Sequence, residues 1–335
     1  MLFRSRHRIA AFVTKIITLN FFDSIKTGLS PSHTAATKIG LARGGVISIG
    51  NFDGVHLGHV SLLRRVRQLA NDYGTSALAV TFDPHPASIL RPENSPLRLM
   101  TLERRASIMS DYGIDQLLVC PVTETFLQLS ASQFFKSLVV DGLAATAMVE
   151  GPNFFFGRGR EGTPEVLAEL CQKSNVGFEV IQPEHDSQAM ISSSRIRDFL
   201  ENGEVEDANQ LLSCPYQICG RVVPGKQRGR VIGFPTANLE DIEVMVPSCG
   251  VYGGSVHVEG RTSMAAIHVG PNPTFDDDTS RKIEVHLIDY EGNLYGKELQ
   301  VDFLFRLRDV VRFTSEIDLV DQLERDVSSV RSRSL

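Results

Sequence analysis

The stretch GNFDGVHLGH, residues 50–59, places two histidines three positions apart, directly after the apolar run from Val46 to Ile49. This order predicts a strand, a tight glycine turn and the first turn of a helix. His56 and His59 then project from one side of that turn. Free backbone amides and the positive end of the helix dipole favour an anion at the same place. The pattern therefore predicts imidazole groups that donate hydrogen bonds to nucleotide phosphates.

Other chemistries fit this stretch less well. A zincin-type zinc site needs histidines at i and i+4 with an acid beside them, whereas the spacing here is i and i+3 with no third ligand nearby. The turn also lacks the G-x-G-x-x-G fingerprint of dinucleotide-binding folds. A structural role is the usual interpretation of a lone histidine. The coincidence of two histidines, glycines and a strand end favours phosphate binding instead.

Two further stretches carry groups suited to phosphate. In ISSSRIR, residues 191–197, serines at a helix start stand close to Arg197, an arrangement that suits a polyphosphate. The alternative is that Ser192 or Ser193 only caps the helix. In GRVIGFPTANL, residues 229–239, a basic glycine-rich segment leads to a hydroxyl and an amide that suit a hard cation and phosphate. The alternative there is a β-turn with an asparagine cap.

The elements that position these groups change in character along the chain. From Val46 to about Phe178, apolar runs alternate with amphipathic stretches, which predicts a doubly wound parallel sheet with helices on both faces. Ligands in such folds lie beyond the carboxyl ends of the strands, where residues 50–59 follow the first core strand. A further strand is expected near Val13 to Leu19. The expected core strands are 46–49, 77–82, 116–119, 146–149 and 177–181, and the expected helices are 57–73, 102–112, 131–140 and 164–174.

After Leu212 the pattern indicates a different architecture. Short strands follow one another with glycine and proline turns but without intervening helices, which predicts an antiparallel barrel or sandwich. A helix over residues 315–327 is expected to close the chain. The expected strands are 216–223, 251–258, 264–269, 283–288 and 299–305.

Composition narrows the class of protein. A length of 335 residues favours two domains. With 42% hydrophobic residues and no apolar run that approaches a bilayer span, we expect a soluble, cytoplasmic protein without a membrane partner. The net charge of −6 disfavours a nucleic-acid partner. The five cysteines lack the spacing of a metal site and are interpreted as reduced thiols. The basic N-terminal residues are interpreted as a disordered extension or an early start codon.

The motifs together resemble one enzyme family. G-x-F-D-G-x-H-x-G-H closely resembles the signature of the H-x-G-H nucleotidylyltransferases, and in particular the adenylyltransferase domain of bacterial bifunctional riboflavin kinase/FAD synthetases. TFDPHP at 81–86 and ISSSRIR support the narrower match. GRVIGFPTANL, GVYGG at 250–254, VGPNPTF at 269–275 and EVHLIDYEGNLYG at 284–296 follow in the order and spacing of riboflavin kinases. The resemblance spans about Val46 to Asp326.

The resemblance implies two linked reactions. A C-terminal kinase phosphorylates riboflavin with ATP to FMN, and an N-terminal adenylyltransferase converts FMN and ATP to FAD and pyrophosphate, each with Mg²⁺. The expected partners are riboflavin, FMN, FAD and ATP, and we expect a monomer or weak homo-oligomer. The implied organisation is an extension with the first strand at 1–43, an adenylyltransferase domain at 44–202, a linker at 203–215 and a kinase domain at 216–330.

The family's functional residues map onto specific positions of this chain. His56 and His59 are the expected catalytic groups for adenylyl transfer, and Glu284 is the expected general base of the kinase. Thr236 and Asn238 are expected to bind Mg²⁺ and phosphate. The other expected ATP-binding residues are Gly50, Asn51, Phe52, Asp53, Ser193, Ser194 and Arg197 in the adenylyltransferase, and Gly225, Gly229, Arg230 and Pro235 in the kinase. The expected flavin contacts of the adenylyltransferase are Asp83, His85, Asn153 and Phe156.

Departures from the family pattern leave alternatives open. Ser194 stands where the family usually has threonine, so the hydroxyl survives. Pro224 stands where the family often has histidine, which leaves closure of the kinase loop and nucleotide affinity open. The acidic run 276–278 is interpreted as a solvated turn. One alternative is an enzyme with a single live activity, and another is a flavin-binding regulator without turnover. Glu284 argues against the regulator, because binding needs no base.

Overall fold

The computed structural model describes residues 14–19, 42–187, 189–271 and 281–333. The chain forms two compact units by packing. The first unit comprises Met1–Pro96 and Leu102–Ile191, and the second comprises Leu97–Thr101 and Ser192–Leu335. The expectations for the N-terminal extension before residue 14, for residues 272–275 of VGPNPTF and for the acidic run 276–278 lie outside the described residues.

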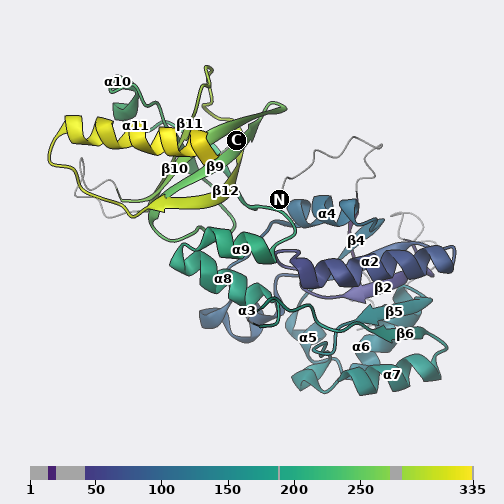
Figure 1. The fold of residues 1–335 in the computed structure, drawn as a ribbon. Coiled ribbons are helices and arrows are strands. Elements are labelled where there is room, and N and C mark those ends of the chain that lie inside the picture. The colour runs from purple at the N-terminus through teal and green to yellow at the C-terminus, as the bar shows by residue number, and fades with distance from the viewer. Residues whose placement is uncertain (1–13, 20–41, 188, 272–280, 334–335) are drawn as a thin grey trace. The chain divides into compact units, whose positions relative to one another are not determined.

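The first unit contains the predicted parallel sheet (Figure 1). Its order is β1-β4-β3-β2-β5-β6, and every neighbouring pair is parallel. Successive strands are added outward from β2 to β3 and β4 on one side, and from β5 to β6 on the other. The topological switch point therefore lies at the carboxyl ends of β2 and β5. The prediction of a doubly wound sheet is confirmed. The strands are β1 (Lys15–Thr18), β2 (Val46–Ile49), β3 (Ala77–Asp83), β4 (Gln116–Pro121), β5 (Ala147–Glu150) and β6 (Gly177–Val180).

Helices lie on both faces of this sheet, with α2 (Leu57–Asp72) and α7 (Pro164–Lys173) on opposite sides in Figure 1. The face of the sheet that carries Ile47 and Ile49 belongs to one large hydrophobic core cluster, which also includes residues of α7. The predicted helix 131–140 is wrong in one respect, because α6 (Ala131–Phe134) continues as a π-helix, η3 (Phe135–Gly142). The shorter elements are α3 (Pro86–Leu90), η2 (Pro92–Asn94), α4 (Leu102–Asp111), α5 (Glu124–Leu127) and η4 (Arg158–Arg160).

The second unit contains a closed antiparallel barrel of order β10-β11-β8-β7-β12-β9. Closure decides between the barrel and the sandwich that the strand pattern left open. Strand β8 was not predicted, and it pairs with β11 so that Asn238 lies directly opposite Glu284. The strands are β7 (Tyr216–Val223), β8 (Ala237–Glu240), β9 (Gly250–Val258), β10 (Arg261–Gly270), β11 (Lys282–Leu287) and β12 (Glu298–Arg308).

Helices complete the second unit. Helix α11 (Glu316–Arg333) runs past the predicted end at 327, because Val330 is fully buried against the barrel in a cluster with Ile288 and Phe305. One helical turn, α10 (Arg228–Val231), lies in the glycine-rich loop. The chain enters the barrel through α8 (Ser193–Asn202) and α9 (Val205–Leu211).

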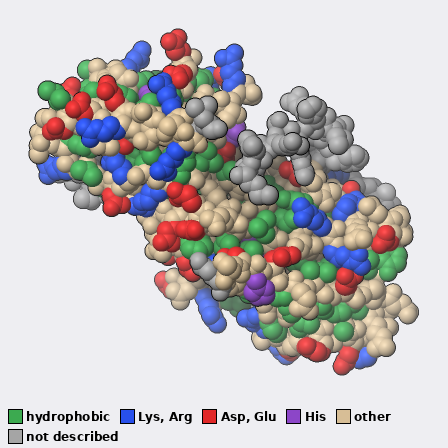
Figure 2. Space-filling view, viewed as in Figure 1, with side chains coloured by type: hydrophobic (Ala, Val, Ile, Leu, Met, Phe, Trp, Pro, Cys, Tyr) green, Lys and Arg blue, Asp and Glu red, His purple; other side chains and the backbone are tan. Residues whose placement is uncertain are grey.

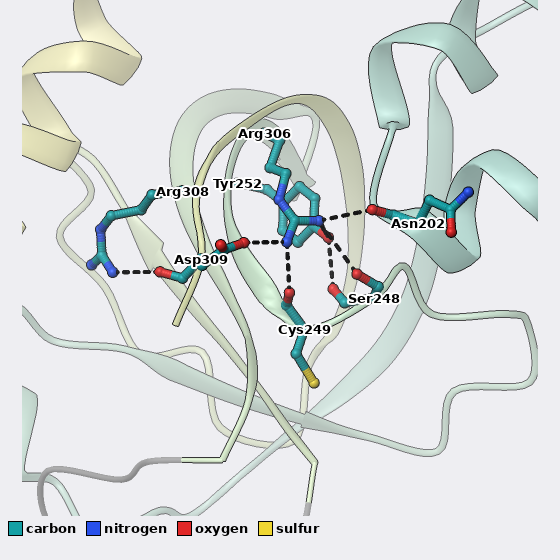
Figure 3. Close-up of polar contacts among 7 residues, drawn as sticks. All are labelled: Asn202, Ser248, Cys249, Tyr252, Arg306, Arg308 and Asp309. Carbon is teal, nitrogen blue, oxygen red and sulfur yellow. Dashed lines mark hydrogen bonds and ion pairs between the residues drawn. The ribbon is translucent and has the colours of Figure 1, made fainter. Parts of the chain in front are cut away.

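Arg306 of β12 joins the end of α8 to the barrel (Figure 3). Its guanidinium donates to the carbonyl oxygens of Asn202 and Cys249 at 3.3 and 3.0 Å and to the Tyr252 hydroxyl at 3.1 Å. A Cβ on Gly203, which ends α8 at a φ of 78°, would lie 1.5 Å from this guanidinium. Glycine is therefore needed there for both the left-handed turn and the close approach.

The surface carries charges of both signs. On the face that Figure 2 shows, Lys and Arg side chains are scattered among Asp and Glu side chains, in keeping with the small net charge of −6. Within the described ranges, none of the helices has the length and apolar character needed to cross a membrane.

Candidate functional site

The histidine pair lies where the sequence predicted, at the start of α2. His56 is the N-cap of the helix, and its Nδ1 accepts a hydrogen bond from the His59 backbone N–H at 3.3 Å. The two imidazole rings stack, with centroids 3.6 Å apart and an interplanar angle of 17°. Phe52 packs edge-on against His59, with ring centroids 5.2 Å apart. The pair therefore acts as one stacked unit at the end of β2.

Burial sets the charge of this pair. It lowers the pKa of His56 from its ordinary value of 6.5 to about 4. The pKa of His59 is also lowered, first by burial and then by the neighbouring His56 and Arg105. Both rings are therefore neutral near pH 7. Because His56 Nδ1 accepts a hydrogen bond, its Nε2 carries the proton and can donate.

The turn before the helix is strained, and Arg105 of α4 stabilises it. Phe52 and Val55 adopt φ values of 48° and 37°, a left-handed region that non-glycine residues rarely occupy. Arg105 of α4 donates to the Asn51 carbonyl at 2.9 Å and forms an ion pair with Asp53 at 3.8 Å. Arg105 and Asp53 are both buried. Arg105 was not among the predicted site residues, since nothing in the local sequence pattern distinguishes it from a surface arginine.

The end of β3 meets the same turn. The side-chain amide of Asn51 lies 2.8 Å from His85 Nε2, so an expected ATP-binding residue contacts an expected flavin-binding one. His85 Nδ1 accepts from the Ala87 N–H at 3.0 Å, which places the proton on Nε2 and favours the Asn51 oxygen facing it. Asn51 retains a buried amide atom without a partner, and His59 Nδ1 is also buried and unpartnered. Asp83, the last residue of β3, is half-buried at the same edge.

The expected flavin loop follows β5. Asn153 is exposed, and its amide donates to Met190 Sδ at 3.4 Å. Phe156 is only 6% exposed and packs against Phe154 and Phe134 in the core. Phe155 is 39% exposed. The structure thus gives Phe156 a packing role and leaves Phe155 as the ring that solvent reaches.

The serine-rich stretch forms the start of α8, in the second unit. Ser192 is the N-cap and accepts from the Arg195 N–H at 3.4 Å, which confirms that one of these serines caps the helix. Ser193 is half-buried and Ser194 is exposed. Arg197 donates to the Leu97 carbonyl at 2.7 Å. The role of Ser193, Ser194 and Arg197 in binding ATP stays a prediction.

The second unit holds a cavity of about 660 Å³ in which the expected kinase residues meet. The Thr236 hydroxyl donates to the Glu284 carboxylate at 3.3 Å, and Asn238 lies opposite Glu284 across the β8–β11 pair. Gly225 and Gly229 also line this cavity. A hydroxyl, an amide and a carboxylate thus converge at one wall.

The glycines of the kinase loop allow a close approach of the backbone. A Cβ on Gly225 would lie 2.3 Å from the Asn238 side-chain nitrogen, and a Cβ on Gly229 would lie 2.3 Å from the Phe234 carbonyl. Gly225 therefore lets the loop lie against β8, and Gly229 lets it lie against the segment that leads into β8. Pro224 also lines the cavity.

Two expected kinase residues lie outside this cavity. Arg230 is exposed and is not among its lining residues. Pro235 lines a neighbouring cavity of about 850 Å³, and its carbonyl accepts from His286 Nδ1, at a separation of 2.8 Å. Their ATP-binding roles stay predictions.

Several residues that line the cavity were not predicted from the sequence. His268 of β10 lies opposite Glu284, and its pKa is lowered by burial despite the opposing effect of that carboxylate. Arg308 forms a bidentate ion pair with the buried Asp326 of α11, with the shortest contact 2.7 Å. This pair holds α11 against the barrel. Apolar residues of α11 and the preceding segment complete the wall, namely Val310, Val311, Phe313, Leu319, Leu323 and Val327.

The donor set at this wall fits a magnesium ion. Hydroxyl and amide oxygens are ligands that Mg²⁺ accepts, and the ion usually completes its shell with substrate phosphates and water. Among the residues described, no three His, Cys, Asp or Glu side chains are grouped to hold a metal by themselves. Thr236 and Asn238 therefore suit an ion that arrives with a nucleotide.

Comparison with known proteins defines the class first. The family model for FAD synthetase matches residues 39–195, and the model for riboflavin kinase matches residues 212–334. The fold and the two sites thus define a transferase with an H-x-G-H sheet domain and a flavokinase barrel.

Similar proteins then identify the family. A bifunctional riboflavin kinase/FMN adenylyltransferase of Listeria monocytogenes is 35% identical over 86% of this chain and 91% of its own length. One of Pseudomonas fluorescens is 35% identical over 87% and 93%. A crystal structure titled as a macrolide-efflux protein from Streptococcus pneumoniae superposes with a TM-score of 0.79 at 31% identity, covering 88% of this chain and 96% of that one. The chain belongs to the bifunctional riboflavin kinase/FMN adenylyltransferase family.

Proposed function

We propose that the barrel unit phosphorylates riboflavin with ATP and that the histidine corner of the sheet unit takes part in adenylylating the FMN to FAD. The observation that carries the proposal is the cavity in which Glu284 faces Thr236 and Asn238. Membership of a family whose curated relatives bear both activities in their names supports it.

In the kinase reaction, Glu284 is the general base. The riboflavin 5′-oxygen forms a bond to the γ-phosphorus, the bond from that phosphorus to the bridging oxygen of ADP breaks, and the hydroxyl proton passes to the Glu284 carboxylate. Thr236 and Asn238 hold the metal and the phosphates. When bound, Mg²⁺ neutralises charge on the transferring group. Most of the rate comes from alignment and charge neutralisation, as in other phosphoryl transfers.

The chemistry of the cavity walls gives the substrates an orientation. The apolar wall built by α11 and residues 310–313 suits the flat, aromatic ring of a flavin. Another part of the lining, with Gly225, Lys226 and Arg228, suits the phosphates of ATP. Glu284, beside Thr236 and Asn238, is proposed to act where a flavin side-chain hydroxyl meets the γ-phosphate.

In adenylyl transfer, the protein positions the reactants and forms no covalent intermediate. An oxygen of the FMN phosphate forms a bond to the α-phosphorus of ATP, the bond from that phosphorus to the β-bridging oxygen breaks, and pyrophosphate leaves. The neutral imidazoles of His56 and His59 donate hydrogen bonds to the phosphates as charge develops. Ser193, Ser194 and Arg197 are further proposed ligands of ATP, and Asp83, His85 and Asn153 are the proposed flavin contacts.

The wider setting is part of the same proposal. The functional domains span 44–202 and 216–330, joined by the linker 203–215. The enzyme works in the cytoplasm as a monomer or weak homo-oligomer, takes only small-molecule partners and uses Mg²⁺ with each ATP.

Incubation with riboflavin and Mg-ATP, followed by chromatographic separation of FMN and FAD, tests the proposal. We expect FMN first and then FAD, and loss of both after chelation of the divalent metal. FMN without FAD indicates a single live activity. Tight flavin binding with neither product indicates a regulator and overturns the proposal.

A further inference from the structure

Glu150 is a buried carboxyl that neither reaction uses. It is the last residue of β5 and is only 2% exposed. Its Oε1 accepts a hydrogen bond from the backbone N–H of Ile49, the last residue of β2, at 2.8 Å. Acidic residues are rarely buried to this extent unless they are paired, so the contact between the two strand ends calls for an explanation.

The contact replaces missing backbone pairing. Strands β2 and β5 pair only from Val46 to Ile47 on the β2 side. On their outer sides the pairing continues to the strand ends, with Ile49 paired to β3 and Glu150 paired to β6. The two central strands therefore part at their carboxyl ends, and the Ile49 N–H faces the gap. The Glu150 side chain closes that gap by accepting from the Ile49 N–H.

The gap lies at the functional end of the sheet. β2 and β5 flank the topological switch point, beyond which ligands lie in this fold class. Ile49 is directly followed by the turn Gly50–Asp53, and Glu150 is directly followed by the loop 151–157. One hydrogen bond thus ties the start of the expected ATP turn to the start of the expected flavin loop.

We propose that Glu150 is a positioning residue that sets the spacing between these two loops by bridging the ends of β2 and β5. The inference rests on the proposed adenylyltransferase function of this edge. Adenylyl transfer requires the FMN phosphate to be in line with the α-phosphorus, and such alignment tolerates little displacement of either loop.

The bridge requires an acceptor oxygen and not a negative charge. Burial raises the pKa of Glu150 well above its ordinary value, an effect that its hydrogen bonds only partly offset. Burial therefore favours the protonated, neutral carboxyl over its charged form. Glutamine, which has the same length and an acceptor oxygen, should preserve the bridge, whereas methionine fills similar space without accepting from Ile49.

The experiment compares three variants of the full chain with the wild type, using supplied FMN and Mg-ATP. We expect Glu150→Met to lower kcat/KM for FAD formation about tenfold or more, and Glu150→Gln to stay within about threefold of wild type. Val149→Ala removes packing from the same buried strand but keeps the carboxyl, and it should also stay within about threefold. FMN formation from riboflavin in the second unit serves as the internal reference.

Hydrogen exchange reports on the bridge independently of activity. Peptides that cover Ile49 should exchange faster in Glu150→Met than in wild type or Glu150→Gln, while peptides from β3 and β4 should not change. Equal losses in the Gln and Met variants would show that charge matters and overturn the proposal. Equal losses in Val149→Ala and Glu150→Met, or full FAD formation in the latter, would also overturn it. A wild type that makes no FAD contradicts the proposed function instead, and the exchange result still decides whether the bridge exists.

Discussion

The two candidate sites are expected to bind the same co-substrate, ATP, but they are built in opposite ways. At the histidine corner the key groups come from one stretch of ten residues, and buried polar contacts from Arg105 and His85 hold it from behind. In the kinase cavity the key groups come from a loop, three strands and a terminal helix that are far apart in sequence. A compact motif and a closed barrel thus offer two routes to a phosphate site.

The difference extends to electrostatics and order. The corner keeps neutral imidazoles and a strained turn with left-handed residues, so its shape is set before a nucleotide arrives. The kinase cavity instead has a carboxylate and, on its glycine-rich loop, the exposed basic residues Lys226 and Arg228. Substitutions at one site should therefore leave the other reaction intact.

The largest expected effect separates the two sites directly. Glu284→Ala removes the proposed base, and we expect FMN formation to fall roughly 10²-fold to 10⁴-fold. Conversion of supplied FMN to FAD should stay at the wild-type rate. Glu259→Ala, which removes an exposed carboxylate from the turn after β9, is the matched control. Equal loss of both activities in Glu284→Ala would refute the assignment of separate sites.

The reverse experiment uses the histidine corner. His59→Ala removes a hydrogen-bond donor to the phosphates, and we expect FAD formation from supplied FMN to fall roughly 10²-fold to 10³-fold. FMN formation from riboflavin should not change. His185→Ala, an exposed histidine of the same unit, should retain both rates. A His59→Ala enzyme that makes FAD at the wild-type rate would contradict the role given to the imidazole pair.

The contrast also explains what the sequence could predict. At the corner, the strand, turn and helix start follow one another along the chain, so local patterns placed His56 and His59 correctly. The supports come from distant positions: Arg105 lies on α4 and Glu150 ends β5. Their neighbours gave no sign that these charged side chains would be buried. Phe156 was ambiguous in the same way, because three adjacent phenylalanines do not reveal which ring faces the core.

At the kinase cavity, local sequence patterns predicted five of the six strands but not the contacts that enclose the cavity. Strand β8 is only four residues long and exists because β7 and β11 both pair with it. The cavity wall from α11 depends on the ion pair between Arg308 and Asp326, which joins the end of one element to another. Such contacts arise only when the barrel closes, and no window of sequence contains them.

A stability measurement sharpens the comparison at the corner. Arg105→Met removes the buried ion-pair partner of Asp53 and the donor to the Asn51 carbonyl, and we expect the free energy of unfolding of the first unit to fall by about 3 kcal/mol. Lys136→Met, which breaks the exposed pair with Asp141, should cost less than about 1 kcal/mol. Denaturant unfolding monitored in both variants checks this. Arg105→Met should lower the rate of FAD formation more than the rate of FMN formation. Similar losses in the free energy of unfolding for Arg105→Met and Lys136→Met would show that the buried pair adds nothing to stability.

The smallest effect tests the neutral histidines through acid stability. The pKa of His56 is about 4 in the folded chain and 6.5 ordinarily, so below pH 6.5 the unfolded chain takes up a proton that the folded chain refuses. The contribution of neutral His56 to the free energy of unfolding is therefore complete above pH 6.5. By pH 5 about 2 kcal/mol of this free energy is lost. His56→Asn keeps a side-chain acceptor for the N-cap but cannot titrate. Denaturant unfolding at pH 7.5 and pH 5 should show a smaller acid loss in this variant than in wild type. An unchanged acid loss would mean that His56 is solvated and charged, and the corner would then resemble the open kinase cavity in its electrostatics.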